Sequence, residues 1–446
     1  MKRRIEFLLL LSIALVPAQA AQAQQMDPTR QAEPAWLLHP EMHANWTAWR
    51  ETMKQTKFPR ETGCFTASYP YTTWNEASCI PAPAKHYSAP ARSDQPNTVG
   101  NTSGDYTAVV SGQLTSVVGS FPIVSGYVPP PLTNYSLQVN SNLFATSSCS
   151  GALNPSACHG WVQFVFDNDA SALLLEYSLI NWGSTNCPSG YGSYAVGGED
   201  ICYKNTPVVG VPEQPYANLP YLELTAQVSG TTNTAILATA DGNIYATANP
   251  GLFGTDLAQN WNTAEFNVFG NGGGDQVNFN SGATFVVQTR VNSGTTTVPY
   301  CPNISYTGET NNLSLVGACC PYGGASPNIQ FMESNNSVAQ SSCGTSGLQG
   351  NITAPPPTDS GTYTISGGPP DPTITFTMIL SDSNPNAEIY WTVPGCAGTL
   401  NGSSPVASGV GFTLVYNPEY NCNPSGTMYA VVPGFLPSQT QPINFP

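Results

Sequence analysis

The chain has 446 residues, of which 40% are hydrophobic but only 9% are charged, against roughly 25% charged residues in ordinary soluble proteins. It holds 27 Asp and Glu against 12 Lys and Arg, a net charge of −15, so it lacks the basic surface that nucleic acid or an anionic membrane requires. These values exclude an ordinary cytosolic enzyme and a nucleic-acid-binding protein, and they leave enough hydrophobic residues for packed cores.

The first residues have the pattern of a secretory signal. A basic start over residues 1–4 precedes an apolar run over residues 5–16 and the sequence Ala18-Gln19-Ala20, which is typical of a signal peptidase site. The apolar run is shorter than the roughly 20 residues that a membrane-spanning helix needs. We therefore predict a signal peptide over residues 1–20, a secreted extracellular or periplasmic protein, and no membrane insertion after signal removal.

Charge is distributed unevenly along the rest of the chain. Residues 26–94 hold seven basic and seven acidic side chains, whereas residues 95–446 hold 19 acidic side chains against only Lys204 and Arg290. This asymmetry predicts a separate basic N-terminal segment over residues 21–94. A body with so few cations changes charge mainly by protonation of its acids, which suits acidic surroundings, although sequence drift explains the asymmetry equally well.

One amphipathic helix is predicted within this segment, over residues 40–56. Its apolar stripe has helical spacing and consists of Met42, Trp46, Trp49 and Met53. The opposite face carries Arg50, Lys54 and Lys57. The helix is either a structural element docked on the body or part of a propeptide whose basic face covers an acidic cleft.

The body, residues 95–345, shows short runs rich in Val, Thr, Tyr and Phe that are separated by Gly, Asn and Pro. The predicted strands are residues 107–110, 114–118, 161–166, 173–182, 221–228, 235–238, 265–269 and 284–291. Because no helical stripe interrupts them, the pattern predicts an all-β sandwich or jelly roll. A Pro- and Gly-rich linker over residues 346–371 and a second, small β domain over residues 372–446 are expected to follow.

Twelve cysteines in a secreted chain indicate disulfides rather than metal ligands. Neighbouring cysteines suggest the pairs Cys64/Cys79, Cys149/Cys158, Cys187/Cys202 and Cys396/Cys422. The four cysteines between residues 301 and 343 allow three pairings. His39 and His43 flank Pro40 and lack the order of a zinc-binding helix, so we predict no metal and no cofactor.

Two stretches of the body resemble a known enzyme family. They are Trp161-Val162-Gln163-Phe164-Val165 and Thr263-Ala264-Glu265-Phe266-Asn267-Val268, and the segment Cys64-Phe-Thr-Ala-Ser-Tyr-Pro70 is similar to the start of secreted bacterial relatives. They resemble the glutamic peptidases, the acid-acting eqolisin family, over about residues 95–335. The resemblance implies a concanavalin A-like sandwich, an acid endopeptidase activity and a catalytic glutamate at Glu265. Because side chains alternate along a strand, we expect Glu265 to share a polar face with Thr263 and Asn267, over an apolar core.

The family's catalytic glutamine has no direct equivalent in this sequence. Its strand falls on residues 173–177, where Glu176 occupies the matching position, and Gln163 on the tryptophan strand is the alternative. Two facing carboxyls share a proton because they resist double ionisation, so Glu176 and Glu265 could titrate as one coupled pair. Glu265 would activate water and Glu176 would hold and protonate the oxyanion. Otherwise Glu176 is a structural carboxylate, satisfied for example by Arg290.

The C-terminal domain resembles the small immunoglobulin-like module at the C-terminus of chitobiases. The similar stretches are residues 380–392 and 426–435. This resemblance implies an accessory module without a catalytic role.

The leading functional hypothesis is a monomeric secreted acid endopeptidase that acts on polypeptides. The alternative is a non-catalytic sandwich that binds an extracellular polysaccharide or a surface partner. The expected substrate-contacting residues are Trp161, Gln163, Trp182 and Trp261. Carboxyls of Glu176 and Glu265 within about 8 Å favour the peptidase, whereas exposed tryptophans along a groove favour the glycan binder.

Overall fold

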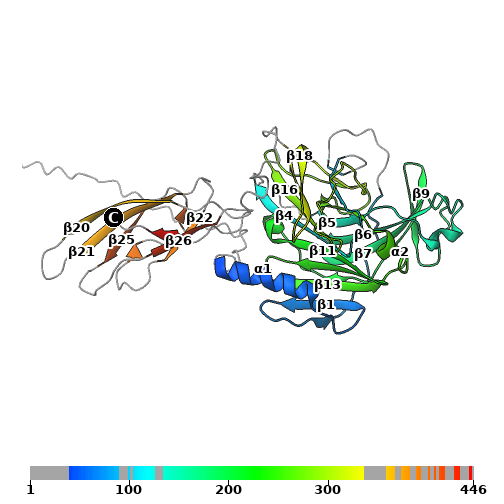
Figure 1. The fold of residues 1–446 in the computed structure, drawn as a ribbon, viewed down its shortest axis with the longest axis horizontal. Helices are drawn as coiled ribbons and strands as arrows, with labels where there is room; N and C mark the ends of the chain where they lie inside the picture. The colour runs from blue at the N-terminus through cyan, green and yellow to red at the C-terminus, as the bar shows by residue number, and fades with distance from the viewer. Residues whose placement is uncertain are drawn as a thin grey trace, which may run out of the picture.

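The computed structural model describes residues 40–89, 99–100, 104–125 and 134–335, together with eight strands of the C-terminal region. The predicted signal peptide and Cys343, Cys396 and Cys422 lie outside the described residues. The predicted fold class is confirmed: the chain is an all-β protein built from large antiparallel sheets, with a short N-terminal helix (Figure 1).

The first large sheet has nine antiparallel strands in the order β18, β19, β16, β4, β11, β12, β13, β1 and β2. Their bounds are β1 (Gly63–Ser68), β2 (Asn75–Ala77), β4 (Ser116–Ser125), β11 (Glu223–Ser229), β12 (Thr232–Ala238), β13 (Asn243–Pro250), β16 (Thr284–Asn292), β18 (Ser314–Tyr322) and β19 (Asn328–Ser334).

The second large sheet has eight strands, seven of them in the order β3, β14, β5, β6, β7, β9 and β8, while β10 pairs with β7. Their bounds are β3 (Thr107–Val109), β5 (Ser136–Ser141), β6 (His159–Asp167), β7 (Ala172–Ile180), β8 (Gly192–Val196), β9 (Glu199–Asn205), β10 (Val209–Gly210) and β14 (Thr263–Phe269).

Short elements connect these strands. They are a parallel pair of β15 (Gln276–Val277) and β17 (Thr310–Asn311), the helix α2 (Asp256–Asn260), and the 3-10 turns Ser147–Gly151 and Tyr216–Tyr221.

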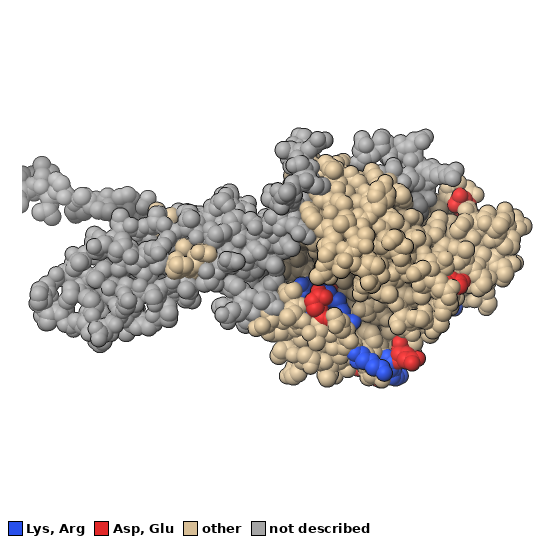
Figure 2. Space-filling view, viewed as in Figure 1, with Lys and Arg blue, Asp and Glu red and all other residues tan. Residues whose placement is uncertain are grey.

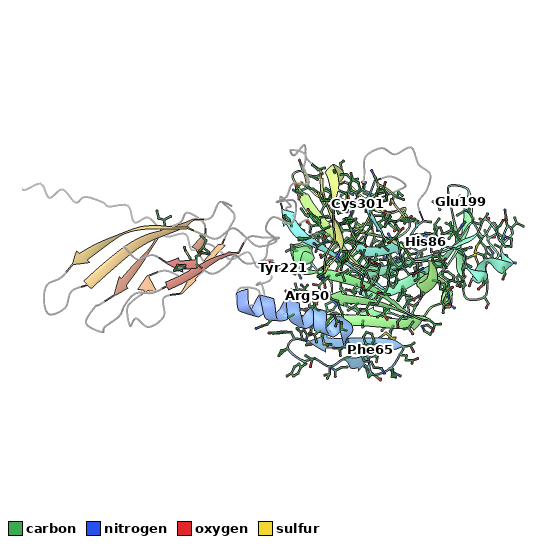
Figure 3. All side chains as sticks on the ribbon, in the orientation of Figure 1. Arg50, Phe65, His86, Glu199, Tyr221 and Cys301 are labelled. Carbon is green, nitrogen blue, oxygen red and sulfur yellow. A yellow bond between two sulfur atoms is a disulfide. The ribbon has the colours of Figure 1, made fainter. Side chains whose placement is uncertain are left out.

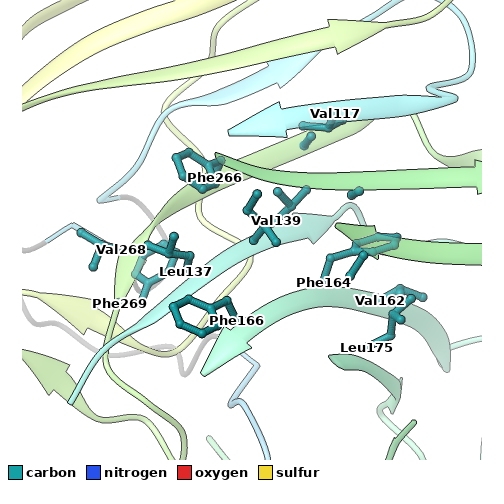
Figure 4. Packing of buried hydrophobic residues seen from close by; sticks show 14 of the residues in the cluster. Val117, Leu137, Val139, Val162, Phe164, Phe166, Leu175, Phe266, Val268 and Phe269 are labelled. Atoms are coloured by element: carbon teal, nitrogen blue, oxygen red, sulfur yellow. The ribbon is translucent and has the colours of Figure 1, made fainter. Parts of the chain in front are cut away.

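One apolar core lies between the two large sheets. Val139, Phe164 and Phe266 of the eight-stranded sheet belong to the same buried cluster as Val117 of β4 (Figure 4). The approach is so close that a Cβ atom at Gly119 of β4 would lie 2.0 Å from the Phe266 ring, so only glycine fits there. Because side chains alternate along a strand, Glu265 of β14 lies on the face opposite Phe266, away from this core, as the sequence predicts.

The predicted helix is confirmed as α1 (Pro40–Gln55), and it lies on the outer face of the nine-stranded sheet. Figure 1 shows α1 alongside β13 and β1. Trp46, Trp49 and Met53 are buried there, and they pack against a surface that includes the small side chains of Ala246 and Ala248. Small residues on β13 allow the two tryptophan rings to approach the sheet closely.

The basic face of α1 binds one buried carboxylate, that of Glu223. Lys54 forms an ion pair with it, Arg290 Nη2 lies 2.5 Å from its Oε2, and Arg290 also contacts Glu51 at 3.2 Å. Burial alone would raise the pKa of Glu223, but the charges of Lys54, Arg50 and Arg290 together lower it below its ordinary value. Few charged side chains appear among the described residues on the face shown in Figure 2.

The N-terminal segment is integrated into the body. Both β1 and β2 are strands of the nine-stranded sheet, and β1 pairs with β13 over its full length. The expected division at residue 94 therefore does not separate two folding units. The charge asymmetry gave no information about this pairing, because strand pairing depends on backbone hydrogen bonds and buried side chains rather than on net charge.

Disulfides join the pairs Cys64–Cys79, Cys149–Cys158 and Cys187–Cys202, as predicted. Among the pairings left open, the structure contains Cys301–Cys319; Figure 3 labels Cys301. Four disulfides among the described residues are typical of a protein that folds in an oxidising compartment.

The C-terminal region contains two four-stranded sheets, with the orders β20-β21-β25-β23 and β24-β22-β26-β27. Their bounds are β20 (Thr358–Ser366), β21 (Thr373–Ser381), β22 (Glu388–Thr392), β23 (Leu400–Asn401), β24 (Val406–Ala407), β25 (Gly411–Tyr416), β26 (Gly426–Val431) and β27 (Gln441–Ile443). The predicted linker over residues 346–371 is wrong for β20, which pairs with β21 along its whole length. Its alternating Thr, Tyr and Ile residues form a strand despite the flanking Gly and Pro.

Candidate functional site

A row of polar side chains crosses the outer face of the eight-stranded sheet. Strand pairing places Glu265 opposite Asn140, Asn140 opposite Gln163, and Gln163 opposite Glu176. Thr107 and Asn205 extend the row at its two ends. We call these six residues the polar row. Its two glutamates and Gln163 are fully buried, although they lie outside the apolar core.

Hydrogen bonds connect Gln163 to two carboxyls, each through one further amide. Gln163 Nε2 donates to Asn140 Oδ1 at 3.1 Å, and Asn140 Nδ2 donates to Glu265 Oε2 at 2.9 Å. On the other side, Gln163 Nε2 donates to Gln138 Oε1 at 3.1 Å, and Gln138 Nε2 donates to Glu309 Oε2 at 2.9 Å. Gln163 is therefore the central link between Glu265 and Glu309.

Glu265 has no cation partner among the described residues. Its oxygens accept from the Ser305 hydroxyl at 2.6 Å, from the Tyr306 N–H at 2.9 Å, and from Asn140. Burial raises the pKa of Glu265 to about 7, against the lowering effect of these hydrogen bonds. Strand alternation thus correctly predicted that Glu265 lies on a polar face.

Glu176 lies three strands from Glu265, with β5 and β6 between them. Three strand spacings correspond to about 14 Å between Cα atoms, so the expected direct pair, in which these two carboxyls share a proton, is not formed. Glu176 instead accepts from the Tyr87 N–H at 3.1 Å and from the Ser178 hydroxyl at 3.2 Å. Burial raises its pKa, and the charge of Glu309 raises it further. Arg290, the partner considered for Glu176, contacts Glu51 and Glu223 instead.

Glu309 is a site residue that the sequence reasoning missed. It follows no strand motif, since it precedes the two-residue strand β17, and only its polar neighbours Thr307 and Thr310 mark the region. Its carboxylate also accepts from the Ser88 N–H at 2.8 Å and the Thr307 hydroxyl at 2.9 Å. Burial raises the pKa of Glu309 to about 7.

A second pair of buried carboxyls lies next along β14. Asn267 Nδ2 donates to Asp105 Oδ2 at 3.2 Å and to Glu333 Oε2 at 3.0 Å. Burial raises the pKa of Glu333 to about 8, and burial together with the charges of Glu265 and Glu333 raises that of Asp105. Within the described residues, no three potential ligands are placed to hold a metal ion.

Two chain segments cover the polar row. Residues 82–89, which we call the strap, cover the Glu176 end: Asn205 Nδ2 donates to the Lys85 carbonyl at 2.7 Å, and the Tyr87 N–H binds Glu176. Residues 305–309, which we call the covering loop, bind Glu265 at the other end.

The strap and the covering loop also bind one another. The Gly308 N–H donates to the Ser88 carbonyl at 2.7 Å. A Cβ atom at Gly308 would lie 2.4 Å from the Ala89 carbonyl oxygen, so the contact requires glycine at this position. His86 of the strap, labelled in Figure 3, contacts the Tyr194 ring with centroids 3.8 Å apart.

The propeptide hypothesis predicted that the basic face of the helix covers the acidic site, but a different element of the N-terminal segment does so. The basic face of α1 lies on the nine-stranded sheet against Glu223, whereas the strap, from the same N-terminal segment, covers the polar row. The amphipathic pattern correctly predicted a helix but contained no information on which sheet it would cover.

The tryptophans expected to bind substrate are buried. Trp261 stacks on Phe164 with centroids 5.8 Å apart in the central core, and Trp182 belongs to the same core cluster. Neither presents a ring to solvent, because apolar rings of this size contribute more when packed in the core. Trp161 lies on the outer face of β6, beneath Ala89 of the strap.

Comparisons with protein-family models and with curated proteins find no match to this chain. Among the described residues there is no helix with the length and hydropathy needed to cross a membrane.

Proposed function

We infer that the chain is the precursor of a secreted acid endopeptidase whose active site is the polar row. The observation that carries this inference is that a polypeptide segment, the strap, already lies against a row of carboxyls and amides, and that these carboxyls have no neutralising cation within the described part of the chain. The resemblance of residues 161–165 and 263–268 to glutamic peptidase strands supports the same class. The four disulfides support secretion.

In this proposal, Glu265 and Gln163 are the catalytic residues. They lie two strands apart, or roughly 10 Å between Cα atoms, with Asn140 on the strand between them. Once the strap and the covering loop have left, the water molecule and the peptide carbonyl would bind over Asn140, between the two side chains. Glu265 takes a proton from the water as it attacks the carbonyl carbon, and Gln163 Nε2 exchanges its hydrogen bond to Asn140 for one to the developing oxyanion. The proton then passes to the leaving nitrogen as the peptide bond breaks.

Two features of Gln163 suit this role. Its amide donates hydrogen bonds at every pH, so it needs no proton of its own in acid. Its Oε1 atom is buried and has no hydrogen-bond partner among the described residues. An unpaired buried acceptor between amide groups is a position where the attacking water can be held. Glu176 already accepts a hydrogen bond from the Tyr87 N–H, and in this proposal it accepts one from a main-chain N–H of the substrate.

The described form is blocked. Glu265 has no exposed surface, and a buried carboxyl with a pKa of about 7 stays protonated in acid and cannot act as a base. Departure of the strap and covering loop would admit solvent and return this pKa toward its ordinary 4.5. The carboxylate would then be available in mild acid.

The glycan-binding alternative lacks its expected feature. Every tryptophan between residues 46 and 335 is buried, so no indole ring of this part of the chain lies open along a groove. Sugar rings bind by stacking on exposed aromatic faces, and the polar row offers none.

The test is digestion of an acid-denatured protein between pH 2 and pH 7, followed by mass spectrometry of substrate and enzyme. Four proteins are compared: the wild type, Glu265→Gln, Gly308→Ala to displace the cover, and Glu61→Gln, an exposed carboxyl, as matched control. We expect peptides below about pH 6 from Gly308→Ala, fewer from the wild type and Glu61→Gln, whose sites are covered, and none from Glu265→Gln. Absence of peptides from both the wild type and a folded Gly308→Ala, or equal cleavage by Glu265→Gln, overturns the proposal.

A further inference from the structure

The strap is held largely through its main chain. The Ser88 N–H donates to Glu309 at 2.8 Å and the Ala89 N–H donates to the Tyr194 hydroxyl at 3.1 Å. The His86 carbonyl accepts from the Gly273 N–H at 2.9 Å, in addition to the main-chain contacts of Lys85 and Tyr87 already described. Contacts to consecutive main-chain groups are the usual way in which a protein binds an extended peptide.

Alternate side chains of the strap, those of residues 85, 87 and 89, point toward the sheet. Lys85 Nζ lies 2.5 Å from Asp167 Oδ2, and the Tyr87 hydroxyl donates to the same oxygen at 2.5 Å. The Tyr87 ring is fully buried in a pocket formed by Val165, Ala172, Leu174 and Val208. Ala89 is buried in a separate apolar cluster with Trp161, Ile180 and Ile201.

These contacts describe a built site with defined side-chain requirements. Asp167 is fully buried and binds a cation and a phenolic hydroxyl together, so it selects for both. Ala89 is buried against Trp161, Ile180 and Ile201, so a small apolar side chain suits this position.

Building on the proposed function, we propose that this face is a peptide-binding groove that takes a cationic residue, a tyrosine and a small residue at alternate positions, and that the strap occupies it in cis. The ligand class is therefore an extended peptide with the pattern of Lys85, Tyr87 and Ala89. The same pattern is the substrate preference of the opened site.

The test is binding in trans of a fluorescent peptide with the strap sequence, Ala-Lys-His-Tyr-Ser-Ala, measured by anisotropy. All proteins carry Glu265→Gln, so that cleavage plays no part. One also carries Gly308→Ala, which displaces the strap, and its control carries Gly112→Ala, where a Cβ atom meets nothing nearer than the Ser293 carbonyl at 3.9 Å.

We expect the Gly308→Ala protein to bind the peptide at least tenfold more tightly than the control, because the cis competitor has left the groove. Replacing the tyrosine of the peptide by alanine should weaken binding at least tenfold. Equal binding by the two proteins, or equal binding of the two peptides, overturns the inference.

A second variant keeps the binding test decisive if Gly308→Ala misfolds. If Gly308→Ala lacks a cooperative melting transition, Tyr87→Ala takes its place, since it empties the tyrosine pocket that the peptide would fill. A folded Tyr87→Ala that does not bind the peptide overturns the inference. Peptide binding without any protease activity in the digestion test supports the groove and removes only the proposed catalysis.

Discussion

The N-terminal segment covers the outer faces of both large sheets, but it does so with opposite chemistry. On the nine-stranded sheet, α1 brings Lys54 and Arg50 to the buried Glu223, which Arg290 also contacts. On the eight-stranded sheet, the strap brings one cation, Lys85, which pairs with Asp167. Glu265 and Glu309 therefore have no ion-pair partner among the described residues.

Under the proposed function, this difference distinguishes a permanent cover, α1, from a removable one, the strap. At the α1 face, apolar side chains are packed together and the charge of Glu223 is neutralised by basic side chains. We therefore expect α1 to remain bound to the sheet at neutral pH. The strap face keeps several carboxyls out of water without cations, which costs free energy whenever they ionise. Natural proteins retain such costly groups mainly at functional sites, where perturbed pKa values are useful.

The largest predicted effect is a loss of stability as the pH rises. The pKa values of Glu265 and Glu309 are raised from 4.5 to about 7, and that of Glu333 to about 8, so the folded protein binds more protons than the unfolded chain between pH 4.5 and 8. Their stabilising protonation is complete below pH 4.5 and is lost as the pH rises through 7 to 8.

We expect the free energy of unfolding to fall by on the order of 5 kcal/mol from pH 5 to pH 9. Urea unfolding across this range measures it. Glu223, whose pKa is lowered, contributes in the opposite sense, since its stabilisation is lost only as the pH falls below 4.5. Constant or rising stability toward pH 9 would show that the carboxyls on the strap side are compensated after all.

The next effect concerns the α1 face. Glu223→Gln leaves Lys54, Arg50 and Arg290 without their shared carboxylate, and we expect a loss of roughly 3–5 kcal/mol in the free energy of unfolding at pH 5. Glu61→Gln, at an exposed position, is the control and should change stability by less than about 0.5 kcal/mol. Similar values for the two variants would remove the distinction between the faces.

The same substitution on the strap face should have the opposite sign. In Glu265→Gln, the new amide can donate to Ser305 and accept from Asn140 and Tyr306, so the hydrogen bonds are kept. We expect no change at pH 5, where the carboxyl is already protonated, and a gain of roughly 1–3 kcal/mol at pH 9. Urea unfolding at both pH values measures it, and a loss at pH 9 would contradict the account.

The smallest effect is that of Tyr87→Phe. It removes the hydroxyl hydrogen bond to Asp167 but keeps the ring in its pocket, so a loss of roughly 1–2 kcal/mol is expected in the free energy of unfolding. Tyr71→Phe is the control, since the Tyr71 side chain is 69% exposed. A null effect of Tyr87→Phe would mean that the hydroxyl contributes nothing to holding the strap.

The sequence predicted local features better than distant contacts. Alternation along residues 263–269 correctly placed Glu265 on a polar face, and spacing correctly predicted α1 and three disulfides. The distance from Glu176 to Glu265 depends on β5, a strand that was not predicted and that lies between β14 and β6. Strand order is fixed by non-local pairing, which no local pattern records.

The dependence on non-local contacts also explains why the sequence did not predict that the strap covers the polar row. The strap contains Pro, His and Ser and has no strand or helix period, so its sequence does not reveal that it contacts Glu176 and Glu309. Each contact joins two residues that are far apart in the sequence, by 89 positions for Tyr87 and Glu176 and by 221 positions for Ser88 and Glu309. Only the folded chain brings them together.

Hydrogen exchange tests the central claim most directly, because it compares the two covers in one molecule. We would measure deuterium uptake of the wild type at pH 8, above the raised pKa values of Glu265 and Glu309, in peptides covering residues 82–89 and residues 46–55. The account predicts that the strap amides exchange at least tenfold faster than the α1 amides, by local opening that leaves the sheets intact. Equal protection of both segments would mean that the strap is as permanent as the helix and would contradict a site that opens.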